Sequence, residues 1–121
     1  NPPAEDEPRE LVVEADGGSR GNPGVAAGGS VVIDPATGAL LAELGVYVGI
    51  TTNNVAEYNG MMAGVRRALE IDPKAELHVR LDSKLVVEQM SGRWKIKNAV
   101  LADLAAEARS ILSGTPVSFG R

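Results

Sequence analysis

The chain has 121 residues, of which 44% are hydrophobic, and this suffices for one globular domain with a sizeable core. It contains no cysteine, which excludes disulfides and zinc sites built on thiolates. Its net charge is −4; residues 1–10 hold four acids and one arginine, so the rest is close to neutral. No apolar run of about 18 residues and no basic-then-apolar leader occurs, so we expect no transmembrane helix and a cytoplasmic location.

Residues 1–9 are rich in proline and acidic side chains and show no apolar periodicity. This predicts a disordered tail or linker, followed by a single domain over residues 10–121. Alternating apolar residues then predict three strands, over residues 10–15, 28–35 and 40–49. Because short Gly/Pro links join them, we expect an antiparallel meander. The stretch DGGSRGNPG between the first two strands is predicted to be a flexible loop.

The apolar spacing changes to a helical period over residues 54–69. Further along, residues 77–81 predict a strand, residues 83–90 and 99–112 predict helices, and residues 116–119 predict a last strand. Strands that are joined through helices require parallel neighbours and right-handed crossovers. We therefore expect an α/β fold with a five-stranded mixed sheet, in which the first strand of the meander also has a parallel partner.

Three carboxylates occur at the ends of predicted elements. Asp16 follows the first strand, Asp82 follows the fourth, and Glu57 lies in the first turn of the long helix. If those strands are parallel neighbours, the two aspartates emerge together at the sheet edge where α/β sheets bind ligands. Glu57 shares a helix stripe with Met61 and Val65, so it should point toward the sheet. Converging carboxylates repel one another, and a hard divalent cation such as Mg²⁺ or Mn²⁺ would resolve this.

Each of these acidic residues also has a purely structural explanation. Asp16 precedes a glycine in a common turn dipeptide. Asp82 or Ser83 could cap the helix that follows. Asn54 and Glu57 match a capping box. All three explanations stay open, but the joint placement of the carboxylates at one sheet edge favours a functional site.

Three stretches of the chain together resemble ribonuclease H type 1: ADGGSRGNPG, TTNNVAEYNGMMAGVRRAL and LDSKLVVEQMSGRWKIKN. The resemblance covers about residues 10–119. It rests on a D-G-x-x-x-x-N-P-G segment, a T-T-N-N-x-x-E helix start and a strand-end D-S, in this order. It is nearest to bacterial members of the family, some of which carry a second, phosphatase-like domain after this one.

The resemblance implies endonucleolytic hydrolysis of the RNA strand of RNA–DNA hybrids, leaving 5′-phosphate and 3′-OH ends. Two Mg²⁺ ions, for which Mn²⁺ can substitute, would act with substrate bound. By the same resemblance, Asp16, Glu57 and Asp82 are the catalytic residues and the metal ligands. We expect a monomer that binds the hybrid without a protein partner or a membrane.

The resemblance also implies a set of substrate-binding residues. They belong to the glycine-rich segment, the helix start and the GRWKIKN connector: Gly17, Ser19, Gly21, Asn22, Thr52, Asn53, Asn54, Trp94 and Lys95. Ser19, Gly21 and Asn22 would contact the RNA strand near the cut, and glycines such as Gly17 would let the backbone approach the minor groove. As alternatives, helix capping would explain Thr52 and its neighbours, and a partly buried anchor would explain Trp94. We expect no catalytic role for Lys84, and an ordinary strand histidine at His78.

Two features depart from the family pattern. Some relatives have a long basic protrusion after GRWKIKN that this chain lacks, so we expect weaker and more salt-sensitive hybrid binding. The family's fourth carboxylate opens a terminal helix after the last strand, and this sequence stops at FGR. We expect that helix to be missing because it was cut off, left out as a disordered tail, or lost in a natural variant; the disordered tail is favoured. The alternative functions are then a hybrid-binding module with little or no catalysis, or another nuclease or transposase of the same fold.

Overall fold

The computed structural model describes residues 9–21 and 24–121, with only the backbone at residues 18–21 and 24–26. Most of the predicted tail over residues 1–9 therefore lies outside the described residues. The described elements are β1 (Glu10–Gly21), β2 (Gly24–Asp34), β3 (Ala39–Thr51), α1 (Asn53–Ile71), β4 (Glu76–Leu81), α2 (Lys84–Met90), α3 (Ala99–Ile111) and β5 (Val117–Gly120). Their order and type match the predicted succession.

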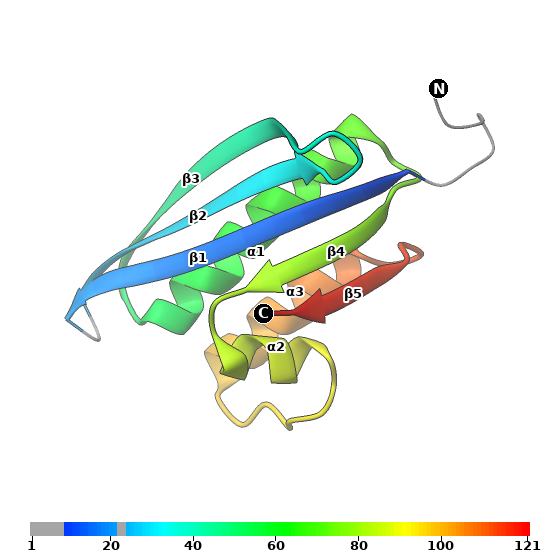
Figure 1. The fold of residues 1–121 in the computed structure, drawn as a ribbon. Helices are drawn as coiled ribbons and strands as arrows, with labels where there is room; N and C mark the ends of the chain where they lie inside the picture. Colours follow the sequence, from blue (N-terminus) through cyan, green and yellow to red (C-terminus); the bar gives the residue numbers. More distant parts are fainter. Residues whose placement is uncertain (1–8, 22–23) are drawn as a thin grey trace.

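The five strands form one mixed sheet in the order β3-β2-β1-β4-β5 (Figure 1). β2 pairs antiparallel with both β1 and β3, whereas β4 lies parallel to β1 and β5 lies parallel to β4. The predicted α/β fold, with three antiparallel strands followed by two parallel ones, is confirmed.

The glycine-rich stretch after Asp16 is a strand, and the prediction of a flexible loop there is wrong. β1 continues to Gly21, and its second half pairs with β2 from Gly17↔Gly28 to Gly21↔Gly24. The composition of the segment disfavours a strand, but a long neighbouring strand satisfies its backbone hydrogen bonds, so tertiary pairing overrides local propensity. Asn22 lies outside the described residues.

Both long helices lie on the same face of the sheet (Figure 1), and the core fills the space between. Leu11 and Val13 of β1, Leu77 of β4 and Met61 of α1 are all fully buried there. The other face of β1 and β4 carries mainly charged side chains, and no described helix covers it. None of the described helices is both long and apolar enough to cross a membrane.

The first turns of α1 pack backbone against backbone on β1 and β2. A Cβ atom added at Gly17 would lie 2.2 Å from the backbone nitrogen of Glu57, and one at Gly28 would lie 2.2 Å from the carbonyl oxygen of Ala56. From the helix side, a Cβ at Gly60 would lie 2.9 Å from the carbonyl oxygen of Gly29. These distances exclude any side chain, so glycine is required for the helix to approach this closely.

Candidate active site

Parallel pairing of β1 with β4 brings two carboxylates to neighbouring positions. Ala15↔Leu81 is the last pair of the register, so Asp16 and Asp82 are the next residues on adjacent strands. Both are exposed. The expected juxtaposition is confirmed, with one correction: Asp16 does not end its strand, because β1 continues beside β2 while the chain after β4 turns away into α2.

Glu57 reaches this edge from α1 and is only 2% exposed. Its Oε1 accepts hydrogen bonds from the backbone N–H groups of Asp82, at 2.7 Å, and Ser83, at 3.1 Å. Its Oε2 also lies 3.1 Å from the Ser83 nitrogen. Glu57 therefore points toward the sheet, as its helix stripe predicted, and fastens the β4–α2 turn to α1.

The capping-box explanation of Glu57 is wrong. Thr52 is the N-cap of α1, and its Oγ1 accepts from the Val55 nitrogen at 3.5 Å. Ser83 caps α2, because its Oγ accepts from the Val86 nitrogen at 3.3 Å. Asp82 is thus not needed as a cap, and its carboxylate has no hydrogen-bond or ion-pair partner among the described residues.

Burial raises the pKa of the Glu57 carboxyl above its ordinary value, and hydrogen bonds from Ser83 and Asp82 partly oppose this rise. The negative charges of Asp82 and Asp16 raise this pKa further. Both predicted aspartates are therefore close enough to Glu57 for their charges to disfavour its ionised form. The ligating atoms of the three carboxylates do not, however, form a cluster within 4.8 Å among the described residues. A cation held partly through water would suit such spacing, and Mg²⁺ usually keeps several of its waters.

The helix start beside this edge is held by a second set of polar contacts. The Ser83 hydroxyl donates to Asn54 Oδ1 at 3.1 Å, which connects α1 to the first turn of α2. Thr52 caps its helix, as the structural alternative predicted, and Asn53 is exposed. The sequence predicts Ser83 only as a possible cap of the following helix. Its position three residues before Val86 indicated that role, but nothing in the sequence indicated its bond to Asn54.

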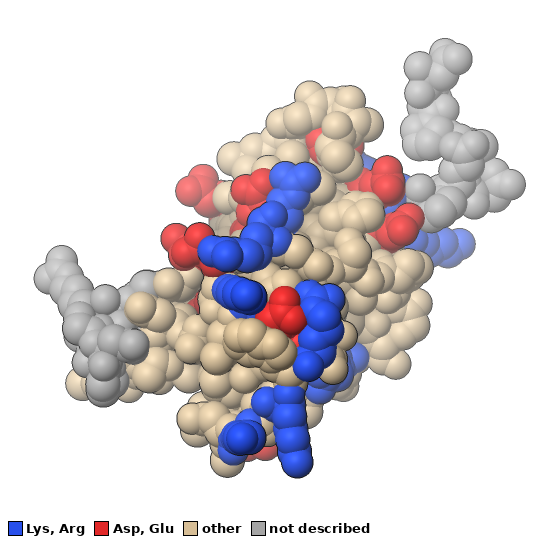
Figure 2. Space-filling model, turned by 60° about the horizontal axis from the view of Figure 1, so that its bottom comes forward, with Lys and Arg blue, Asp and Glu red and all other residues tan. Residues whose placement is uncertain are grey.

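Lysine and arginine side chains gather on the face that α2 and residues 91–98 share, with acidic groups among them (Figure 2). Trp94 is 44% exposed, so part of it lies at the surface and part is covered, which fits both a contact with a ligand and a partly buried anchor. The ammonium group of Lys84 lies 5.9 Å from the centre of that ring, a cation–π distance. Arg93 is bound to Glu88 through two contacts, of 2.6 and 3.1 Å, whereas Lys95 is exposed and has no such pairing with any residue that the structure describes.

The glycine-rich residues of the predicted substrate site are only partly described. Ser19 and Gly21 belong to the backbone of β1, and their side-chain surroundings lie outside the described part of the chain. Gly17 is described, and the structure explains why it is glycine: a side chain there would clash with the backbone in the first turn of α1. The predicted contacts of these residues with RNA remain predictions.

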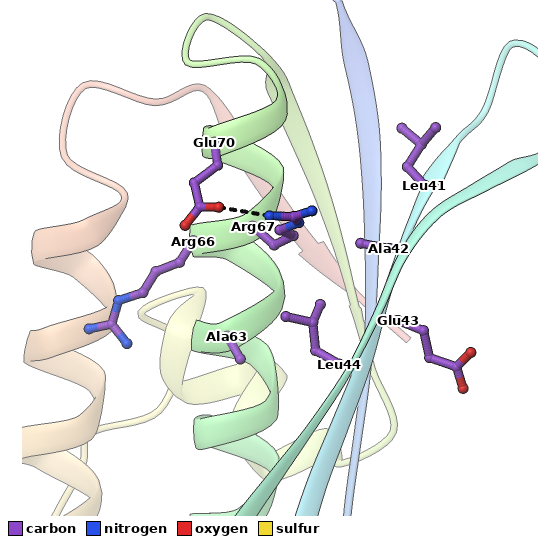
Figure 3. A pocket seen from close by; sticks show the side chains of 8 residues that line it. All are labelled: Leu41, Ala42, Glu43, Leu44, Ala63, Arg66, Arg67 and Glu70. Atoms are coloured by element: carbon purple, nitrogen blue, oxygen red, sulfur yellow. Dashed lines mark hydrogen bonds and ion pairs between the residues drawn. The ribbon is translucent and has the colours of Figure 1, made fainter.

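Two hollows bear on where a ligand could sit. One of about 340 Å³ lies beside Asp16 and is bordered by Glu14, Val31 and Glu43 on the uncovered face of the sheet. A groove of about 560 Å³ runs between α1 and β3 (Figure 3). Its arginines are already paired, Arg67 with Glu70 at 3.0 Å and Arg66 with Glu107 at 3.1 Å. The second hollow holds none of the predicted catalytic residues, so the first is the better candidate for part of a substrate site.

Comparison with known proteins identifies the family. A family model described as "Reverse transcriptase-like" matches residues 14–118. The "Bifunctional protein Rv2228c" of Mycobacterium tuberculosis is 50% identical over 103 residues, which are 85% of this chain but 28% of that protein. The "Ribonuclease HI" of Halobacterium salinarum is 38% identical over 82% of this chain and 49% of its own length. This chain thus spans less than half of either relative.

Solved structures agree. The N-terminal RNase H domain of Rv2228c from Mycobacterium tuberculosis, solved as a fusion with maltose binding protein, superposes with a TM-score of 0.86 at 46% identity, covering 92% of this chain and 85% of that one. LC11-RNase H1 in complex with RNA/DNA hybrid superposes with a TM-score of 0.85 at 35% identity, covering 93% and 85%. The family model and these structural similarities together show that the chain belongs to the ribonuclease H family, and the placement of Asp16, Glu57 and Asp82 at one sheet edge agrees with this.

Proposed function

We propose that this chain hydrolyses the RNA strand of RNA–DNA hybrids at internal positions, with two metal ions, and leaves 5′-phosphate and 3′-OH ends. The observation that carries the proposal is the convergence of Asp16, Glu57 and Asp82 at one sheet edge in a member of the ribonuclease H family. A similar protein, LC11-RNase H1, has been solved with an RNA/DNA hybrid. We also propose that the protein is cytoplasmic and acts as a monomer without a protein partner.

The donor set fits Mg²⁺, with Mn²⁺ as a substitute. The three side chains offer only carboxylate oxygens, which are the ligands that hard divalent cations prefer. Asp16 and Asp82 are exposed, and mutual repulsion with Glu57 would be relieved by positive charge between them. When bound, such ions would activate the attacking water and stabilise the leaving oxygen of the scissile phosphate.

The protein's own contribution is to position these carboxylates and the hybrid. Glu57 holds the backbone of Asp82, so the direction of that carboxylate depends on the α1–β4 contact. We propose that Thr52, Asn53 and Asn54 bind the hybrid beside this edge. Lys95 would contact backbone phosphates and Trp94 would offer its exposed ring to a deoxyribose. The glycine-rich strand, with Gly17, Ser19, Gly21 and Asn22, would contact the 2′-OH groups that distinguish RNA from DNA.

A second candidate function is a hybrid-binding module with little or no turnover. The observation that favours it is the exposed basic connector with Trp94, which can bind nucleic acid whether or not cleavage follows. Binding and cleavage must therefore be measured separately.

The test uses a hybrid with labelled RNA, incubated with Mg²⁺, Mn²⁺ or EDTA. We expect internal cleavage that requires metal. Asp16→Asn should lower the rate at least about a thousandfold, equivalent to some 4 kcal/mol of barrier. Asp103→Asn is the matched control, because Asp103 is an exposed aspartate on α3. Hybrid binding without metal-dependent cleavage would favour the binding module, and the absence of both would overturn both functions.

A further inference from the structure

A second group of ligating side chains lies at the opposite end of the β1–β4 pair. Glu10 pairs with Glu76 in the register, and His78 follows two residues later on β4. All three belong to the sheet face that no described helix covers, and one ligating atom of each lies within 4.8 Å of the others. Asp16 lies six positions after Glu10, which is roughly 20 Å along an extended strand. The group is therefore separate from the candidate active site.

His78 is the chain's single histidine, and both of its ring nitrogens have partners. Nδ1 lies 2.9 Å from Ser118 Oγ on β5, and Nε2 lies 3.0 Å from Glu10 Oε1. Histidines that ligate metals usually use one ring nitrogen for the ion while a hydrogen bond from the other fixes the ring. The Nδ1–H group can donate that bond to Ser118 Oγ, and the unprotonated Nε2 then faces the carboxylates.

The charges around this group favour a cation. Glu10 and Glu76 are adjacent like charges on neighbouring strands, which is unfavourable without a counter-charge. Two of the nearby arginines already have partners, since Arg80 lies 3.4 Å from Glu14 and Arg9 lies 3.3 Å from Asp34; Arg121 lines the hollow beside His78. Glu76 has no hydrogen-bond or ion-pair partner through its side chain among the described residues.

The group is also open to solution. The side chain of His78 is 35% exposed and that of Glu10 is 57% exposed. Both line a hollow of about 320 Å³ on the uncovered face, to which β5 contributes Ser118 and Phe119. An ion could therefore enter without any movement of the sheet.

We propose that Glu10, Glu76 and His78 bind a divalent transition-metal ion, Zn²⁺ in the first instance, at the start of β1 and β4. One imidazole nitrogen and two carboxylate oxygens form a ligand set that suits Zn²⁺ and leaves a fourth position for water. Mg²⁺ prefers oxygen ligands alone, so it should not compete. The ion would tie β1 to β4 at the end of the sheet farther from the three active-site carboxylates.

The single histidine allows a direct test. Uniformly ¹⁵N-labelled protein is titrated with ZnCl₂ while the ring nitrogens of His78 are observed by NMR. We expect one ring nitrogen to shift strongly and to saturate with Zn²⁺ but not with Mg²⁺. Glu76→Gln should weaken this response at least about tenfold, and Ser118→Ala should weaken it by a similar factor because ring orientation is lost. Neither substitution should disturb the fold, because Glu76 is only half-buried and Ser118 is exposed, so no unpaired polar group becomes buried.

The same titration on Asp16→Asn separates this inference from the proposed hydrolysis. The His78 signals should respond as in the unmodified protein, because Asp16 lies at the other end of β1. Ring signals that stay unchanged at millimolar Zn²⁺ would overturn the proposal and leave a hydrogen-bonded histidine. An equal response to Mg²⁺ would also overturn it, and neither result would affect the proposed cleavage.

Discussion

The two ends of the β1–β4 pair carry carboxylates that are held in different ways. At the carboxyl end, Glu57 is 2% exposed and accepts hydrogen bonds from two backbone N–H groups. At the amino end, Glu10 and His78 are held only by side-chain contacts and remain open to water. The first geometry is set by the packing of the fold, whereas the second depends on rotamers that a ligand could order. A preorganised group of the first kind suits catalysis, because it does not reorganise during the reaction.

The first substitution changes the buried carboxylate. Glu57→Gln keeps an oxygen that can accept from the Asp82 and Ser83 N–H groups but removes the negative charge. We expect hybrid cleavage to fall at least about a hundredfold, or some 2.7 kcal/mol, with little change in thermal stability. Single-turnover cleavage and thermal unfolding are the measurements. Glu70→Gln on the same helix is the control, since Glu70 is exposed and pairs with Arg67. Equal rates for the two variants would show that the buried charge is not used.

A second substitution tests whether backbone packing between α1 and β2 sets the geometry at the carboxyl end of the β1–β4 pair. Gly28→Ala would place a Cβ 2.2 Å from the Ala56 carbonyl oxygen, so α1 would have to move away from β2. We expect a loss of about 3 kcal/mol in the free energy of unfolding, measured with urea. Gly45→Ala in β3 is the matched control, because its Cβ would meet no atom within 4 Å and its φ is not positive. A loss at Gly45 as large as at Gly28 would contradict the packing argument.

Much of the fold and part of the site could be predicted from the sequence. Apolar periodicity located all eight elements, and the parallel pairing needed to place Asp16 beside Asp82 followed from the helix between their strands. The extent of β1 could not be predicted, since its glycine-rich half is extended only because β2 pairs with it. The partners of Glu57 could not be predicted either, because its hydrogen bonds join residues 25 and 26 positions apart.

The exposed connector, residues 91–98, offers a test of nucleic-acid binding at a third place, away from both ends of the β1–β4 pair. Lys95 is exposed and has no ion-pair partner among the described residues, so Lys95→Ala removes a charge without disturbing the fold. If Lys95 contacts a phosphate, its loss should change how hybrid binding depends on salt. The slope of the logarithm of the hybrid association constant against the logarithm of the salt concentration should become less steep by about one unit. Fluorescence anisotropy with a hybrid at several salt concentrations measures this slope. Lys74→Ala, an exposed lysine in the turn before β4, should leave it unchanged. A shallow slope in the unmodified protein would contradict the expected salt sensitivity.

The smallest expected effect is the pH dependence of stability that arises from Glu57. Burial raises the pKa of its carboxyl in the folded state above the ordinary value of 4.5. Between these two pKa values the folded state binds more protons than the unfolded state, so the free energy of unfolding falls as pH rises through that window. Glu57→Gln has no such group, so the stability of the unmodified protein relative to this variant, measured in EDTA, should decline as pH rises above the ordinary pKa of 4.5. Urea unfolding of both proteins at each pH measures the difference. A difference that rises with pH would mean that the two N–H donors outweigh burial and the neighbouring aspartates, and that the Glu57 carboxylate is stabilised in its charged form before any cation binds.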